Sequence, residues 1–145
     1  MFKAISTLFS GKQPEQTAPI DSKLAVAVLL VHLIDIDGET TKEEGALVSK
    51  VLSEHFELTP SQVARLIASA HKKDQEAVDF YQFTSIITQL EMSQRIDIIA
   101  MMWKVVFADN HNHEMEDNMV WRVAELIGVS ARDRTILRKK FAEAE

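Results

Sequence analysis

The sequence predicts an all-α fold of about seven helices arranged as two pseudo-symmetric halves. Glycine and proline are scarce, with four and three residues among 145, which favours long helices over strands joined by tight turns. Apolar residues recur at helical spacing along most of the chain, and no segment predicts a strand. An acidic pattern also occurs twice, because Asp37 and Glu44 are matched by Asp109 and Glu116, each 72 positions further along.

The first 20 residues are predicted to lie outside the helical domain, which we place at residues 21–145. The apolar residues of this segment recur at helical spacing and form one side of a short amphipathic helix: Phe2, Ile5, Leu8 and Phe9. Residues 11–19 are polar, contain two prolines and indicate a flexible linker. The short helix could contact a membrane or a partner, or it could fold back on the domain or fray.

The first half begins with a helix capped by Asp21 or Ser22 and running to about residue 36. This helix is apolar on nearly every face, which is typical of a central helix, and we expect His32 to be a hydrogen-bonded core histidine. A second helix begins at a capping box formed by Thr41 and Glu44 and runs to about residue 56.

A third helix begins at Thr59, with Pro60 at its first helical position. It is predicted to end at a polar break, residues 71–76. A linking helix at about residues 78–90 then joins the two halves.

The second half repeats the plan. An apolar helix ends near Asp109, a second helix spans about residues 114–127 and stops at Gly128, and Ser130 caps the last helix. Trp103 and Trp121 lie on apolar stripes and are expected in the core. Two basic clusters, residues 72–73 and 138–140, are expected to be solvated faces or a basic patch.

Composition excludes several functions. The net charge of −6 is not typical of a protein that binds nucleic-acid backbones, so we expect no nucleic-acid partner. The absence of cysteine excludes disulfides and fits a reducing compartment, and no signal peptide is evident, so a cytoplasmic protein is expected. No Ser-His-Asp order, glycine-rich phosphate loop or HExxH motif occurs, so we expect no enzymatic activity.

The repeated acidic positions have two interpretations. As helix caps, Glu44 and Glu116 would each accept hydrogen bonds at the positive end of a helix, while Asp37 and Asp109 would stabilise turns. Alternatively, the two loops could meet and bind one divalent cation. An all-oxygen set suits Ca²⁺ or Mg²⁺, and His113 would shift the preference towards Mn²⁺ or Zn²⁺.

The chain resembles the TerB-like family, a helical domain associated with tellurite resistance. The resemblance rests on Asp37-Gly38 with Glu43-Glu44, on residues 79–84 (DFYQFT), on residues 103–109 (WKVVFAD), and on Glu116 with residues 120–130 (VWRVAELIGVS). It covers about residues 21–143. Asn110 departs from the family, which usually has glycine there, but asparagine also adopts left-handed turns.

The resemblance implies an all-α fold of two related halves whose acidic positions bind a divalent metal. On this basis Asp37, Glu44, Asp109 and Glu116 are the expected ligands. Related domains occur in stress-response modules and in membrane-anchored co-chaperones, which implies a protein partner, membrane-associated in some cases, and a location at the inner face of the membrane. Two functions therefore stay open: a metal-binding stress-response module, and a metal-free protein-interaction scaffold whose acidic residues are caps.

Overall fold

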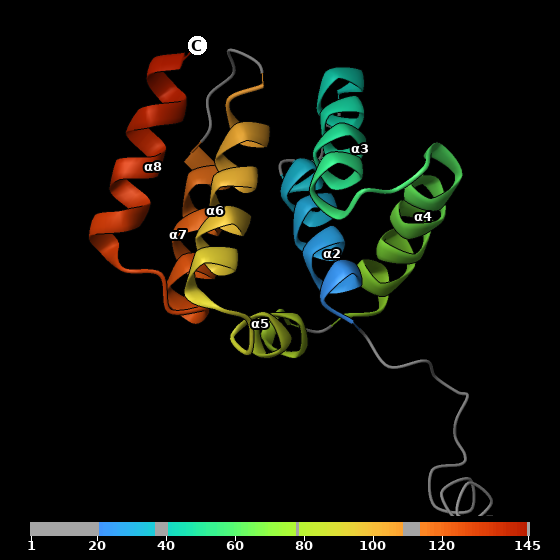
Figure 1. Cartoon of the computed structure of the whole chain (residues 1–145), viewed down its shortest axis with the longest axis horizontal. Coiled ribbons are helices and arrows are strands. Elements are labelled where there is room, and N and C mark those ends of the chain that lie inside the picture. The colour runs from blue at the N-terminus through green and yellow to red at the C-terminus, as the bar shows by residue number, and fades with distance from the viewer. Residues whose placement is uncertain (1–20, 37–40, 78, 109–113, 145) are drawn as a thin grey trace, which may run out of the picture.

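The computed structural model describes residues 21–36, 41–77, 79–108 and 114–144. This part of the chain contains seven helices and no strand, so the predicted all-α class is confirmed (Figure 1). The helices are α2 (Ser22–Asp35), α3 (Lys42–Phe56), α4 (Pro60–Glu76), α5 (Tyr81–Ile87), α6 (Met92–Val106), α7 (Glu114–Leu126) and α8 (Ala131–Ala144). Residues 1–20, with the predicted short helix and linker, lie outside the described part.

Helix α2 is the centre of the molecule. It packs against α3, α4, α5, α6 and α7, and nine of its 14 residues are buried, which confirms the central position expected from its apolar sequence. Figure 1 shows α2, α3 and α4 on one side, α6, α7 and α8 on the other, and α5 across one end. The two groups of three helices correspond to the two predicted halves, whose structural equivalence stays a prediction.

The core combines the apolar sides of both groups. Its largest fully buried side chains include Trp103, Phe83 and Leu29, and Trp103 is 0% exposed, as expected. Trp121, also expected in the core, is only partly buried, and the Arg134 guanidinium lies over its ring, 4.4 Å from the ring centroid.

The predicted helix starts are confirmed. The Asp21 carboxylate accepts a hydrogen bond from the N–H of Leu24, and Thr41 and Thr59 each form a complete capping box. In the second half, the Ser130 hydroxyl accepts a bond from the N–H of Asp133. The sequence therefore specified these boundaries through local side-chain chemistry.

Two boundaries were predicted wrongly. Residues 71–76 do not form a polar break, because α4 continues through them to Glu76, and the linking helix is shorter than predicted, at Tyr81–Ile87. The polar run is compatible with a helix because several of its side chains face solvent. Asp74 is also held from across the fold by His32, a contact that local sequence does not reveal.

None of the helices in the described part is long and apolar enough to cross a bilayer.

Candidate functional site

Glu44 occupies the third position of α3, and its side chain is buried, with 4% of the residue exposed. Its Oε1 atom accepts a 3.0 Å hydrogen bond from the N–H of Thr41, and the Thr41 hydroxyl accepts one from the N–H of Glu44. The capping interpretation is therefore correct for this residue.

Glu116 is the matching residue of the second half. It occupies the third position of α7 and is also 4% exposed. Together with Thr84, Glu44 and Glu116 are the buried polar side chains of the described part. Two carboxylates, 72 positions apart, thus have the same place on their helices and the same burial.

The remaining predicted ligands lie outside the described residues: Asp37, Asp109 and His113. Within the described ranges, no three histidine, aspartate or glutamate side chains come together as a metal site. The structure thus places two of the five predicted ligands, and the predicted convergence of all five stays a prediction.

A second candidate site is a groove of about 660 Å³ along one side of α7. Helix α7 contributes residues three, four, seven and eleven positions apart, which lie on one side of a helix: Met115, Asn118, Met119, Arg122 and Leu126. The facing wall comes from the C-terminal ends of α2 and α4 and from the start of α5: His32, Ile36, Asp74, Ala77, Asp79, Phe80 and Tyr81. Packing of α7 against α2 and α5 holds the two walls together.

The wall opposite α7 is fixed by a histidine–aspartate pair. His32 Nδ1 lies 2.8 Å from Asp74 Oδ1, and the imidazole ring meets Phe80 edge-on with centroids 4.7 Å apart. The side chains of His32 and Asp74 are 35% and 15% exposed, so the pair is at the edge of the groove. His32 therefore has a hydrogen-bond partner, as expected, but it lies at the edge of the groove and not in the core, where the sequence placed it. Its contacts orient the ring and connect α2 to the end of α4.

The groove has an apolar surface that is open to solvent. Tyr81 is 70% exposed, Met115 is 52% exposed and Leu126 is 41% exposed. The described part has only two other exposed large hydrophobic residues, Met92 and Ile136, and neither lines the groove. A concave site with three such residues is suited to binding an apolar partner surface.

Sequence reasoning did not find this groove. Met115 and Leu126 lie at helical spacing from Met119, at offsets of four and seven, but they were assigned no role from sequence. That spacing was the available signal. The facing wall comes from segments more than 30 positions away, so the groove itself could not be derived from local pattern.

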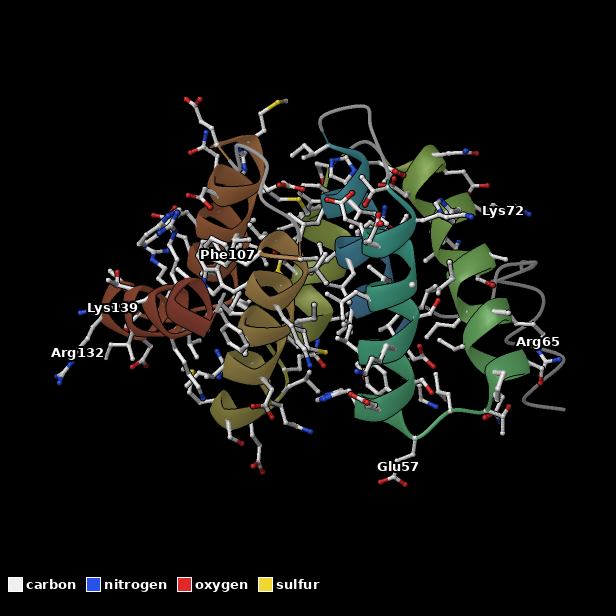
Figure 2. The ribbon with its side chains drawn as sticks, turned by 90° about the horizontal axis from the view of Figure 1, so that it is seen from above. Glu57, Arg65, Lys72, Phe107, Arg132 and Lys139 are labelled. Carbon is white, nitrogen blue, oxygen red and sulfur yellow. The ribbon has the colours of Figure 1, made fainter. Side chains whose placement is uncertain are left out.

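None of the residues of the two basic clusters lines the groove. Figure 2 shows Arg65 and Lys72 at the outer edge of α4, and Arg132 and Lys139 at the outer edge of α8, on opposite sides of the molecule. The expected solvated faces are thus correct for Lys72 and Lys139, both exposed. Arg138 differs, because its guanidinium contacts Asp117 at 2.7 Å and lies over Trp103.

These features define an all-helical domain with two buried acidic helix starts and an open apolar groove. Residues 23–139 match the family model described as tellurite resistance protein TerB. The match covers well over half of the chain, so the protein belongs to the TerB family, which confirms the resemblance seen in its sequence. Comparison with curated proteins and with solved structures gives no match.

Proposed function

We propose that this protein is a non-catalytic interaction domain whose groove along α7 binds an amphipathic helix of a partner protein. The observation that carries this proposal is the clustering of Tyr81, Met115 and Leu126, three exposed large hydrophobic residues, around one groove. Exposed apolar surface is costly in water and is reduced when a partner covers it.

The groove chemistry indicates the kind of helix that fits. Methionine side chains adapt to varied apolar shapes, and tyrosine contributes strongly to protein interfaces. Asp74 and Asp79 add negative charge to the wall opposite α7. An amphipathic helix with an apolar stripe and a basic flank would complement both features.

The test is a binding measurement with a fluorescein-labelled synthetic helix that has a leucine stripe and lysine flanks. We expect saturable binding by anisotropy, and a Tyr81→Ala/Leu126→Ala variant should bind at least about tenfold more weakly, a loss of about 1.4 kcal/mol. The matched control is Ile136→Ala, which removes an exposed hydrophobic residue of α8 outside the groove. Equal weakening by the control, or no binding to the wild type, would contradict the proposal.

A second proposed function is binding of a divalent cation. The observation that favours it is the matched burial of Glu44 and Glu116, each 4% exposed at the third position of its helix. Burying a carboxylate is costly unless hydrogen bonds or a cation compensate. Asp37, Asp109 and His113 are the proposed further ligands. The oxygen-rich set suits Ca²⁺ or Mg²⁺, and His113 would favour Mn²⁺ or Zn²⁺.

Thermal unfolding separates this proposal from simple capping. Each of the four cations is added to the wild type and to a Glu44→Gln/Glu116→Gln variant, with chelator as the reference. Glutamine still serves in a capping box, so capping alone predicts a small change that is independent of metal. A bound cation at a hundredfold excess over Kd would stabilise only the wild type, by about 2.7 kcal/mol. The absence of metal-dependent stabilisation would exclude this site.

We further propose a cytoplasmic role in a stress response, in contact with a protein partner at the inner face of the membrane. The support is at the family level, because the matching family is described as tellurite resistance protein TerB. The test measures growth on tellurite of cells that lack the gene. These cells are complemented either by the wild type or by the Tyr81→Ala/Leu126→Ala variant. Equal tellurite tolerance with and without the gene would argue against it.

A further inference from the structure

We propose that residues 2–9 of this chain bind in the groove along α7 and compete with external helices, an inference that rests on the proposed helix-binding function. The segment has the chemistry the groove requires. Its apolar residues recur at helical spacing: Phe2, Ile5, Leu8 and Phe9. Lys3, four residues before Thr7, lies with it on the polar side of such a helix, so the match to the groove rests on the apolar stripe.

The dimensions also agree. A helix of eight residues is about 12 Å long, and the groove side of α7 extends about 16 Å between the Cα positions of Met115 and Leu126. A two-turn helix therefore fits alongside α7. An isolated helix of this length is barely stable in water, so contact with the groove would supply the stabilisation that its own hydrogen bonds cannot.

The connection between the segment and the domain is long enough. Residues 10–20 can extend to about 36 Å, while the groove residues His32 and Ile36 lie only about 16 to 22 Å along the α2 axis from Asp21. A flexible chain of eleven residues has a root-mean-square end-to-end distance of about 18 Å. Because this length matches the span, the effective concentration of the segment at the groove would be in the millimolar range.

This concentration predicts regulation by competition. A segment that binds in trans with a Kd of about 0.1 mM would, when tethered at about 1 mM, weaken binding of an external helix about tenfold. A partner with a longer apolar stripe would displace it, and its binding would uncover residues 2–9. The segment would thus act as an internal competitor for the site.

The first experiment locates the segment in the full chain. The protein contains no cysteine, so Thr7→Cys, on the polar side of residues 2–9, accepts a single nitroxide label. We expect loss of amide signal at Tyr81, Met115 and Leu126, and unchanged signals around Ile136 on α8. Adding Ile5→Glu/Leu8→Glu should restore the lost signals.

Two results of that experiment would overturn the inference. One is unchanged signals at the groove residues. The other is an equal loss when spin-labelled chains are mixed with isotope-labelled chains that carry no nitroxide, because the occupant would then be a second copy.

The second experiment separates this inference from the proposed function. The labelled synthetic helix is titrated into the full-length wild type and the full-length Ile5→Glu/Leu8→Glu variant. We expect about tenfold tighter binding to the variant, because the internal competitor is removed. Equal affinities for the two proteins would overturn the inference while leaving the helix-binding function intact. No binding to either protein would overturn both.

Discussion

The two sides of α7 differ in how they are covered by neighbouring helices. One side is closed by α8, which packs against both α6 and α7. There the Arg138 guanidinium contacts Asp117 at 2.7 Å and lies over Trp103 and Phe107, and Arg134 donates a hydrogen bond to the carbonyl of Trp121. Aromatic surface on this side is covered by cationic side chains, but three buried polar atoms there have no hydrogen-bond partner within the described residues: Trp103 Nε1, Asp117 Oδ1 and Arg134 Nε.

The other side of α7 has no such cover. Met115 and Leu126 are exposed, and the exposed Arg122 lies between them on the same stripe, facing the groove. One side of α7 is therefore covered by α8, whereas the other side lines an open apolar groove. Met119, which also lines the groove, is buried in the core, whereas Met115 and Leu126 stay exposed.

The largest effect on stability is expected when one aromatic residue is replaced on each side. Trp103→Ala removes a fully buried ring from the closed side and should lower the free energy of unfolding by about 3–5 kcal/mol. Tyr81→Ala removes a ring that is 70% exposed at the groove and should change it by less than about 0.5 kcal/mol. Urea unfolding followed by circular dichroism gives both values. Similar losses would show that the groove side is part of the stabilising core.

A smaller effect is expected from a matched pair of arginines. Arg138→Ala removes an ion pair, two ring contacts and side-chain packing, and should cost about 2 kcal/mol. Arg122→Ala, on the open side, should cost less than about 0.5 kcal/mol because the residue is exposed. Thermal unfolding at two salt concentrations measures both. If Arg122→Ala were the more costly change, the assignment of open and closed sides would be wrong.

The smallest effect on stability is expected at the C-terminal end of α7, which both sides share. Gly128 ends the helix with φ +79°, and an added Cβ would lie 3.1 Å from Arg95 Nη1. Gly128→Ala should therefore cost about 1 kcal/mol. Glu57 ends α3 with φ 56°, so Glu57→Gly should stabilise by up to about 1 kcal/mol (Figure 2). Calorimetry should show melting temperatures that move in opposite directions, and shifts of the same sign would refute the strain argument.

The acidic positions show how far sequence reasoning extends. The spacing of Thr41 and Glu44 specified a capping box, and the structure contains it. The same spacing placed Glu116 at the matching position of α7, where it is equally buried. The boundary at residues 71–76 was predicted wrongly because it depends on contacts that local sequence does not contain. A polar run can lie on a solvent-facing helix surface, and the contact that holds Asp74 comes from His32, 42 positions away.

By itself, the sequence determined the all-helical class, the central place of α2 and the starts of four helices, because apolar periodicity and caps act within a few residues. The tertiary structure alone decided which apolar residues of α7 are buried and which stay exposed at a groove. That choice depends on where α8 packs and on how the ends of α2 and α4 meet α5. Local pattern shows that a side chain is apolar, but burial depends on neighbours that are distant in the chain.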